Sequence, residues 1–425
     1  MSSSCELFIG DYSILTQETR VIPESMLIFR ESDKKIYSIK DEDNEEQQVI
    51  EYSNTVENIR QRLNVLGYSL EKIKIKFEIE KSKILNDFEE EEDSGEEWYR
   101  DYQKERKTKF EILKNSTFDD WGNAFSVIHK SKLRRIYSWQ DDSSAHNNFS
   151  PLIRYILSAN DNNDIFYNFP GGDILSVVRL FLENCSPIFL VRLDISDLVG
   201  AGYYEADQSV CSEALTALTE NYPVYEKIVV LTEGSTDGKF LQKSLELLFP
   251  HLSEYYSFMD VASSKAGGGA SSLVKSVRSF AGSGISNRII AIFDNDTEGI
   301  KQKEILLRKE LPKNIKVMNY PDTDFAREYP ASGVSSKNIN GLACSIELYL
   351  GSDVLKKGGE IMPIKWGGFD DLTKKYQGEI SNKTEVQKNF QKKINECTKN
   401  PSLLLTTDWN ELKIVWNEIF KVFES

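Results

Sequence analysis

Two segments of the chain place carboxylate side chains directly after an apolar run. In the first, RIIAIFDNDTEG at residues 288–299, Asp294 and Asp296 fall in one loop. Two carboxylates held close together repel each other unless a cation lies between them or one of them stays protonated. Proteins bind Mg²⁺ through carboxylates together with substrate phosphates. The pair therefore indicates a metal-dependent phosphate site or, in the alternative interpretation, a strand that ends in a polar Asp/Asn turn.

The second acidic segment, VVLTEGSTDGKFL, also follows an apolar run and carries Glu233 and Asp237. Gly234 lets the chain turn sharply after Glu233. Asp237 falls near the start of the helix that follows, where it is either a metal ligand or a helix cap. If the two apolar runs are neighbouring parallel strands, Glu233 and Asp294 lie at the same edge of one sheet.

Strands and helices alternate around these two segments. Strands are predicted at residues 227–232, 255–260, 288–294 and 314–320, with helices between them at 237–249, 269–281 and 297–310. This alternation predicts an α/β fold with a mostly parallel sheet and helices on both faces. In such sheets, functional sites gather at the carboxyl ends of the strands. The glycine-rich stretch at 263–272 is either a phosphate-binding loop that includes Lys265 or a flexible connector.

The chain on either side of this region follows other patterns. Residues 1–220 begin with short apolar runs typical of strands and continue with helical periodicity: strands at 5–15, 25–30 and 34–40, and helices at 55–67, 69–88 and 96–113. We interpret them as an N-terminal α+β domain for scaffolding or oligomerisation. Residues 221–425 hold the α/β domain and, after Pro321, a loop-rich section with a helical C-terminal extension.

Charge and composition narrow the class of protein. The 425 residues carry a net charge of −15, with 40% hydrophobic and 28% charged residues, which is typical of a soluble globular protein. The acidic balance argues against a broad basic surface for nucleic acid, although a local basic groove is compatible with it. The five cysteines form no CxxC pair, and no run of 18 apolar residues is present. We therefore expect a cytoplasmic protein without a membrane span, whose metal is held by oxygen ligands.

The order and spacing of the two acidic segments resemble the TOPRIM domain, the metal-binding module of topoisomerases, primases and several nucleases. In that family a glutamate-glycine pair follows the first strand, and a DxDxxG motif follows the third. Five residues match these motifs: Glu233 and Gly234 for the first, and Asp294, Asp296 and Gly299 for the second. The resemblance covers about residues 226–320 and implies a Rossmann-like fold that binds a divalent metal.

The segment EGSTDGKFL is more similar to the nuclease branch of this family, which includes the OLD-family (overcoming lysogenization defect) nucleases and related phage-defence effectors. Those nucleases have an acid four positions after the first glutamate, which Asp237 matches. They also have a later acid and a lysine. Glu347 in CSIELYL matches the later acid, and Lys383 is preferred for the lysine, with Lys365 as its rival.

The N-terminal half resembles the domain that accompanies TOPRIM modules in HEPN/TOPRIM-associated proteins of defence loci. HEPN ribonucleases use an Arg-x4-6-His motif. None of the three histidines, His129, His146 and His251, has an arginine at that spacing before it. The resemblance therefore implies a scaffold in this half of the chain rather than a second active site.

The nuclease resemblance implies one or two Mg²⁺ or Mn²⁺ ions held by carboxylates: Glu233, Asp237, Asp294, Asp296 and Glu347. The implied catalytic residues are Glu233, Asp294, Asp296 and Lys383. Lys383 would neutralise charge that develops in the transition state, and Glu233 would be either a metal ligand or a general base. The implied reaction is phosphodiester hydrolysis of nucleic acid by an endonuclease, with DNA favoured over RNA.

Control by other molecules is expected, because an unregulated nuclease endangers its own cell. We expect an anti-phage effector silenced or activated by a regulatory protein or by homo-oligomer assembly. The chain has no GxxxxGK[ST] motif, so an ATPase would be a separate subunit. Two alternatives remain open. FDNDTEG also fits the DxDxT motif of haloacid-dehalogenase-like (HAD-like) phosphatases, with residues 369–372 as the late acidic pair, and the chain could instead be a non-catalytic metal-binding subunit.

Overall fold

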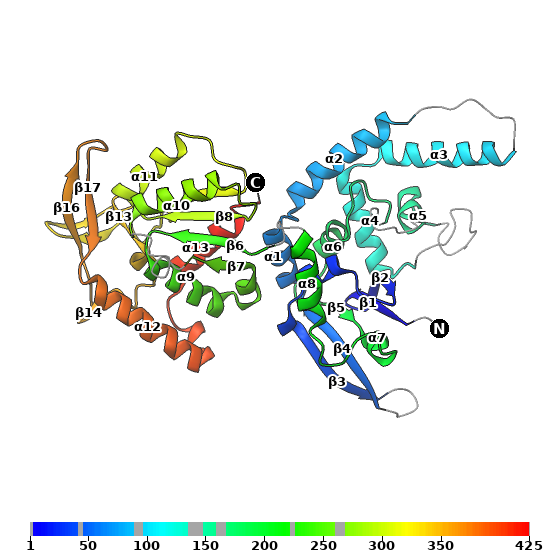
Figure 1. Ribbon diagram of the computed structural model, residues 1–425, viewed down its shortest axis with the longest axis horizontal. Coiled ribbons are helices and arrows are strands. Elements are labelled where there is room, and N and C mark those ends of the chain that lie inside the picture. The colour runs from blue at the N-terminus through cyan, green and yellow to red at the C-terminus, as the bar shows by residue number, and fades with distance from the viewer. Residues whose placement is uncertain are drawn as a thin grey trace. The chain divides into compact units, whose positions relative to one another are not determined.

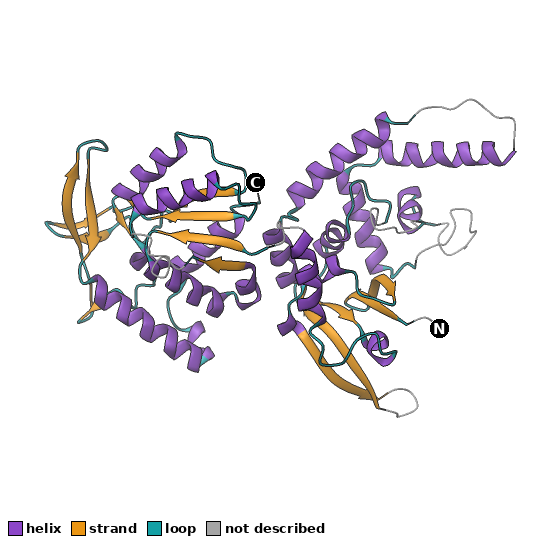
Figure 2. Cartoon of the chain, viewed as in Figure 1, coloured by secondary structure: helices purple, strands orange, loops and turns teal. Residues whose placement is uncertain are grey.

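The chain folds into two compact units, Met1–Asn221 and Tyr222–Phe423, which Figure 1 colours along the chain and Figure 2 by secondary structure. The structure is a computed structural model that describes residues 3–40, 46–88, 97–134, 148–158, 167–221, 226–259 and 268–424. Residues 263–267 of the glycine-rich stretch, including Lys265, lie outside the described residues. No described helix is long and apolar enough to cross a membrane.

The first unit contains an antiparallel five-stranded sheet in the order β2-β1-β5-β4-β3. Its strands are β1 (Ser4–Ile9), β2 (Tyr12–Glu18), β3 (Lys34–Lys40), β4 (Glu46–Thr55) and β5 (Leu190–Asp194). In β1 every second side chain is buried, namely Cys5, Leu7 and Ile9. This alternation arises because successive side chains of a strand point to opposite faces, and only one face meets the core.

Eight helices complete the first unit among its described residues: α1 (Val56–Leu66), α2 (Leu70–Asn86), α3 (Glu97–Asn115), α4 (Phe118–Lys130), α5 (Pro151–Leu157), α6 (Ile174–Glu183), α7 (Ser196–Gly200) and α8 (Val210–Asn221). Gly67 ends α1 with a positive φ of 97°, as its position in the sequence predicts. The strand predicted at 25–30 is wrong, because Pro23–Ile28 is a 3-10 helix. Its residues 25–28 are all buried, so they lack the alternation that a half-buried strand needs.

The second unit contains a parallel four-stranded sheet in the order β10-β8-β6-β7. Its strands are β6 (Ile228–Thr232), β7 (Tyr256–Phe258), β8 (Ile289–Phe293) and β10 (Ile315–Asn319). Helices α10 (Ala270–Gly282) and α11 (Thr297–Leu307) cover one face, and α9 (Ser235–Leu248) and α13 (Asn410–Lys421) cover the other (Figure 1). All five residues of β8 are buried, since helices cover both of its faces. The predicted mixed α/β architecture with a parallel sheet is confirmed.

The predicted helical C-terminal extension is wrong in part. It does contain α12 (Lys383–Lys399) and α13, but the chain between β10 and α12 also forms seven strands. Four of these make a second sheet, here called the outer sheet, in the order β12-β11-β16-β17: β11 (Tyr329–Ala331), β12 (Val334–Lys337), β16 (Ile364–Asp370) and β17 (Lys375–Ile380). The remaining strands pair two by two: β9 (Asn295–Asp296) with β13 (Ala343–Cys344), and β14 (Lys356–Lys357) with β15 (Glu360–Ile361).

The outer sheet is hard to predict because its strands are short and largely exposed. Gly367 and Gly368 interrupt β16 and form the irregularity in its pairing with β17. Glycine weakens strand patterns because it has no side chain to pack. β17 has only Gly378 and Ile380 buried, so its hydrophobic pattern is weak.

Candidate active site

The two acidic segments meet at one edge of the parallel sheet. β6 and β8 are hydrogen-bonded neighbours that run in the same direction, so both end at the same edge. Glu233 follows β6 directly and Asp294 follows β8 directly. The backbone N–H of Asp294 donates a hydrogen bond of 2.9 Å to Glu233 Oε1. The structure therefore brings these two predicted residues into contact at the carboxyl end of the sheet.

The spacing of the DxDxxG segment has a steric explanation. Asp296 precedes α11 as its N-cap, and its Oδ1 accepts a hydrogen bond of 2.7 Å from the backbone N–H of Gly299. A Cβ atom on Gly299 would lie 2.2 Å from the carbonyl oxygen of Asp294, which is far inside van der Waals contact. Only glycine therefore lets the first turn of α11 pack against the backbone that carries Asp294.

Asp237 has a structural role as well as a place in the acidic cluster. Its Oδ2 accepts a hydrogen bond of 3.1 Å from the backbone N–H of Gly234 and so caps α9. Burial raises the pKa of Asp237 to about 6, and the nearby Glu347 adds to the rise. Asp237 thus caps α9 through one of its oxygens, and its raised pKa shows that its carboxyl also interacts with Glu347.

Glu347 and Lys383 form an ion pair beside these acids. Glu347, in a 3-10 turn at Ile346–Tyr349, is fully buried, and its Oε2 lies 3.2 Å from Lys383 Nζ. Ser345 and Gln387 also donate to the Glu347 carboxylate, at 2.7 and 2.8 Å. The rival lysine, Lys365, is an exposed residue of β16. Of the two lysines, the structure therefore brings Lys383 to the acids.

The carboxyls of the cluster raise one another's pKa. Burial raises the pKa of Asp294 well above its usual value, and Glu233, Asp237 and Asp296 raise it further by repulsion. Burial also raises the pKa of Glu233 to about 7, with Asp296 and Asp237 adding to the rise, and it raises the pKa of Asp296. Burial works against the charge of Lys383, but Glu347, Asp294 and Asp237 outweigh it and raise its pKa.

We predict that the free energy of unfolding of the metal-free protein falls as the pH rises from about 4 to about 7. A carboxyl with a raised folded-state pKa binds protons more tightly in the folded than in the unfolded state, so its ionisation favours unfolding. With pKa values of about 7 for Glu233 and about 6 for Asp237, the loss develops above pH 4 and is complete above about pH 7. Urea unfolding in EDTA at pH 6 and pH 8 measures it. The difference should shrink in Glu233→Gln, and an unchanged difference would contradict this assignment.

One feature of the acidic cluster, an unpaired carboxylate oxygen, fits a divalent metal ion. Oδ1 of Asp294 is buried and has no hydrogen-bond partner among the described residues. A buried, unpaired carboxylate oxygen is costly unless a proton or a cation satisfies it. Among the described residues, no group of three or more Asp, Glu, His or Cys side chains is arranged so that it could hold a metal ion, so a bound ion would require these carboxyls to move closer together. Both oxygens of Asp296 and of Glu347 accept protein hydrogen bonds, so Glu233, Asp237 and Asp294 are the carboxyls best placed to bind a cation.

Sequence reasoning missed the polar residues that support the acids. Gln377, from β17, donates to Asp296 Oδ2 at 2.5 Å and accepts from the backbone N–H of Glu298 at 3.0 Å. Ser345 and Gln387 support Glu347 in the same way. Side-chain amides and hydroxyls are common on protein surfaces, and these three lie outside the acidic segments. No feature of the sequence distinguishes them.

Asp370, in the late acidic pair that the phosphatase alternative requires, binds groups outside the acidic cluster. Asp370 ends β16, and its carboxylate lies 2.6 Å from Lys301 of α11. It also accepts hydrogen bonds from the backbone N–H groups of Leu372 and Thr373. Lys301 lowers the pKa of Asp370 well below its usual value. These contacts fasten the tip of the β16–β17 hairpin to α11 and account for Asp370 structurally.

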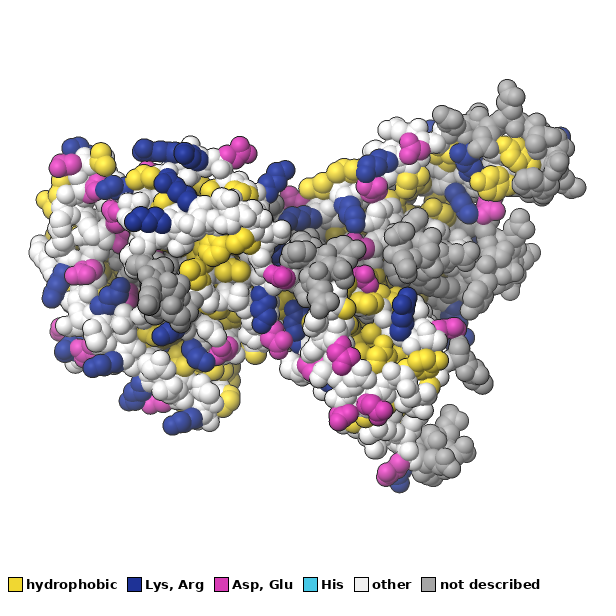
Figure 3. Space-filling model, in the orientation of Figure 1, with side chains coloured by type: hydrophobic (Ala, Val, Ile, Leu, Met, Phe, Trp, Pro, Cys, Tyr) yellow, Lys and Arg dark blue, Asp and Glu magenta, His cyan; other side chains and the backbone are white. Residues whose placement is uncertain are grey.

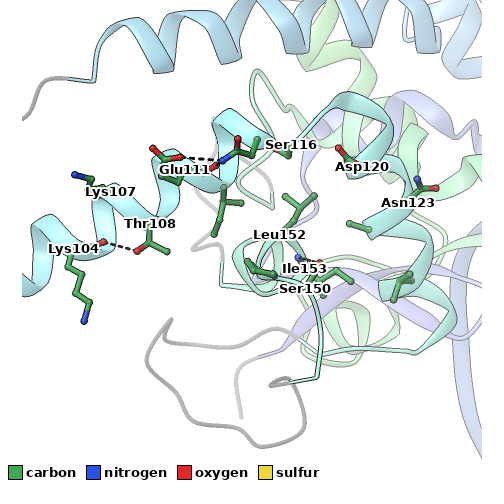
Figure 4. A pocket seen from close by; sticks show the side chains of 15 residues that line it. Lys104, Lys107, Thr108, Glu111, Ser116, Asp120, Asn123, Ser150, Leu152 and Ile153 are labelled. Carbon is green, nitrogen blue, oxygen red and sulfur yellow. Dashed lines mark hydrogen bonds between the residues drawn. The ribbon is translucent and has the colours of Figure 1, made fainter.

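A large cavity lies in the first unit, whereas the acidic cluster belongs to the second. It has a volume of about 870 Å³, and Figure 4 shows its lining from α3, α4 and the start of α5. Its polar side chains are largely engaged in local helix contacts. Asp120 bonds to Thr117 at the start of α4, and Ser150 caps α5. The cavity has no cluster of acids, so we assign the chemistry to the second unit.

The comparison with protein families concerns the first unit. The model of the family HEPN/Toprim N-terminal domain 1 matches residues 1–217, about half of the chain. The chain belongs to this family. Membership confirms the predicted link of the N-terminal half to HEPN/TOPRIM-type proteins and indicates a nuclease-like function. No curated protein and no solved structure matches the chain.

Both ring nitrogens of His129, in the first unit, are in contact with neighbouring residues of the fold. Its Nε2 lies 3.1 Å from the carbonyl oxygen of Ile9, and its Nδ1 lies 3.7 Å from Cys185 Sγ. The ring also packs edge-on against Tyr12. Contacts on both ring nitrogens tie α4 to the sheet and to the end of α6. His146 lies outside the described residues.

Proposed function

We propose that the second unit hydrolyses phosphodiester bonds in nucleic acid, with DNA favoured over RNA, at the acidic cluster of Glu233, Asp237, Asp294 and Asp296. The observation that carries this proposal is the buried, unpartnered Oδ1 of Asp294 beside Glu233 at the carboxyl edge of a parallel sheet. The link of the chain to HEPN/Toprim-type proteins supports it. Bound Mg²⁺ or Mn²⁺, as one or two ions, would activate water and offset phosphate charge.

Each residue of the site has a role that follows from its surroundings. Glu233, Asp237 and Asp294 would hold the metal, with Asp296 and Glu347 completing the site. In the alternative role, a Glu233 that does not bind the metal would take a proton from the attacking water. Lys383 stays charged beside the acids and is suited to donate to a phosphate oxygen. Glu347 orients Lys383 through their ion pair.

A substrate panel tests this function. The purified full chain is incubated with single-stranded DNA, plasmid DNA, RNA and a generic phosphomonoester, each with 5 mM Mn²⁺ or with EDTA. We expect slow, Mn²⁺-dependent cleavage of the nucleic acids and no release of phosphate from the monoester. Phosphomonoester hydrolysis without nucleic-acid cleavage would favour the HAD-like phosphatase. Metal binding without any hydrolysis would favour a non-catalytic subunit.

Lys383→Met is expected to lower the cleavage rate about 100-fold, because it removes a positive charge that stabilises the transition state. Lys365→Met is the matched control and should change the rate less than threefold, since Lys365 is exposed on β16. Single-turnover cleavage in Mn²⁺ measures both rates. Lys383→Arg should recover part of the activity. Equal losses in the two methionine variants would contradict the preference for Lys383.

A local basic surface lies on the helix that starts at Lys383. Along α12, Lys388, Lys392 and Lys399 are exposed on one side together with Glu396, which lies 3.7 Å from Lys392. Figure 3 shows Lys and Arg side chains spread over the visible face of the second unit. Such a surface can bind phosphates although the chain carries a net charge of −15. It supports the expectation of a local groove on an acidic protein.

Binding of nucleic acid is therefore expected to weaken steeply with salt. Replacing both Lys388 and Lys392 by alanine removes two phosphate contacts and should lower the slope of log K against log salt by about 1.4 for a single strand. Anisotropy titrations of a labelled single strand between 50 and 300 mM NaCl measure the slope. A double variant with the wild-type slope would show that α12 does not contact the phosphates.

Control by a partner or by assembly belongs to this proposal, as does a role in anti-phage defence. An unregulated nuclease would damage its own cell, so the isolated chain should cleave weakly at physiological Mg²⁺. The first unit supports a role in contacts, because Ile75 and Ile79 of α2 lie one helical turn apart and are 55% and 52% exposed. The controlling partner would be a regulatory protein, a separate ATPase subunit or a second copy of the chain. Strong constitutive cleavage would contradict control.

A further inference from the structure

A row of aromatic side chains lies on one face of the outer sheet. The register of β16 and β17 pairs Trp366 with Gly378 and Phe369 with Tyr376, so the three rings project from the same face. The rings of Phe369 and Tyr376 are 5.0 Å apart, and these residues are 48% and 51% exposed. Exposed aromatic groups of this kind mark interaction sites more often than isolated exposed residues do. We call Trp366, Phe369 and Tyr376 the aromatic row.

Positive charge accompanies the aromatic row. Lys337 Nζ lies 4.7 Å from the ring centroid of Trp366. The two aspartates at the tip of the hairpin are each paired with a lysine: Asp370 with Lys301 at 2.6 Å, and Asp371 with Lys374 at 3.6 Å. Lysines beside exposed rings complement a ligand that offers flat bases and a phosphate backbone.

The aromatic row is joined to the acidic cluster through β17. Tyr376 belongs to the row, and the next residue, Gln377, donates to Asp296 Oδ2 at 2.5 Å. The carbonyl oxygen of Tyr376 accepts a hydrogen bond of 2.9 Å from the Thr297 hydroxyl at the start of α11. β17 therefore contacts the acidic cluster through Gln377 and carries an exposed aromatic ring at the preceding residue, Tyr376. Because successive side chains of a strand point to opposite faces, the aromatic row and Gln377 lie on opposite faces of β17.

We propose that the aromatic row binds unpaired bases of the nucleic-acid substrate by stacking, an inference that rests on the phosphodiesterase function proposed above. Base stacking on aromatic rings needs exposed base faces, which a duplex hides within its own stack. The inferred substrate class is therefore a single strand, or a duplex with an unpaired segment. The row holds the bases, and Lys337 neutralises a phosphate next to them.

Binding and cleavage measured separately test this inference. The probe is a fluorescein-labelled 20-nucleotide single strand, compared with the blunt duplex of the same sequence, in EDTA so that no cleavage occurs. The variant is Phe369→Leu/Tyr376→Leu in the full chain. We expect the wild type to bind the single strand at least tenfold more tightly than the duplex, and the variant to lose at least tenfold in affinity for the single strand.

Tyr203→Leu is the matched control, since Tyr203 is 50% exposed but lies in the first unit. It should change the affinity less than twofold. If the double variant melts more than 5 °C below the wild type, the single variant Phe369→Leu replaces it, with an expected loss of about threefold.

Wild-type affinity in a folded aromatic variant would overturn the stacking inference, even if cleavage is intact. A change in oligomeric state with unchanged affinity would also overturn it and assign the row to contacts between copies. A wild-type protein that binds the single strand through the row but cleaves nothing in Mn²⁺ would instead refute the proposed hydrolysis. The two proposals therefore fail in different experiments.

Discussion

Asp294→Asn is expected to lower the cleavage rate about 1,000-fold and to weaken metal binding, while the fold survives. Burial and the neighbouring carboxyls raise the pKa of Asp294 well above its usual value, and its Oδ1 has no hydrogen-bond partner among the described residues. Removing one preorganised electrostatic group from an active site typically costs 100-fold to 1,000-fold in rate. An amide at this position keeps the shape of the side chain but removes its charge.

The same variant should raise the melting temperature of the metal-free protein. Removing one of several repelling carboxylates relieves the strain that raises their pKa values at neutral pH. The rise in melting temperature on adding Mn²⁺ should shrink, because less metal binds the folded state. Asn295→Ala is the matched control. The Asn295 amide donates to Asp322 at 2.7 Å, so its loss should lower stability by about 1 kcal/mol but change cleavage less than fivefold.

Two results would contradict this account of Asp294. One is full activity in Asp294→Asn. The other is a wild-type melting temperature that does not change with Mn²⁺ up to 10 mM. Either would favour the interpretation of Asp294 and Asp296 as a polar turn that ends β8.

Arg62→Ala is expected to lower the free energy of unfolding of the first unit by about 3–5 kcal/mol. Arg62, in α1, is 1% exposed, and its guanidinium binds both oxygens of Asp33, at 2.5 and 3.3 Å. It also donates to the carbonyl oxygen of Ile28 at 2.8 Å. Removing it leaves a buried carboxylate and a buried carbonyl without their main donor. Breaking one partner of a buried pair costs far more than breaking an exposed one.

Urea unfolding followed by circular dichroism measures the loss in Arg62→Ala. Lys83→Ala is the control, because Lys83 of α2 is 61% exposed and pairs with Glu80 across one helical turn. It should change the free energy of unfolding by about 0.5 kcal/mol at most. A loss below 1 kcal/mol in Arg62→Ala would show that water reaches the Arg62–Asp33 pair.

The parallel sheet could be predicted from the sequence because its signals are local and strong. The runs that form β6 and β8 are continuously apolar, as expected for strands covered on both faces. The acidic residues and glycines that follow them have the spacing of the two motifs. Two motifs at the ends of neighbouring strands therefore predict that Glu233 lies beside Asp294, as the structure shows.

The parts that could not be predicted depend on tertiary contacts. Arg62 lies between apolar positions of α1, and an arginine there is expected at the surface, yet Asp33 from a distant turn buries it. Gln377 supports Asp296 from a strand whose pattern is mostly exposed. The outer sheet pairs segments whose glycines and short lengths hide the strand period. None of these contacts has a signal in residue type or spacing.

Direct measurement of Mn²⁺ binding tests the central claim most directly, because it requires neither a substrate nor an activating partner. Electron paramagnetic resonance of Mn²⁺ titrated with the full chain gives the free ion concentration, and Glu233→Gln is measured in parallel. The account predicts that the wild type binds Mn²⁺ at micromolar to submillimolar concentration and that Glu233→Gln loses at least tenfold in affinity. A wild type that binds no Mn²⁺ up to 10 mM, or a variant that binds it equally well, would contradict the metal site.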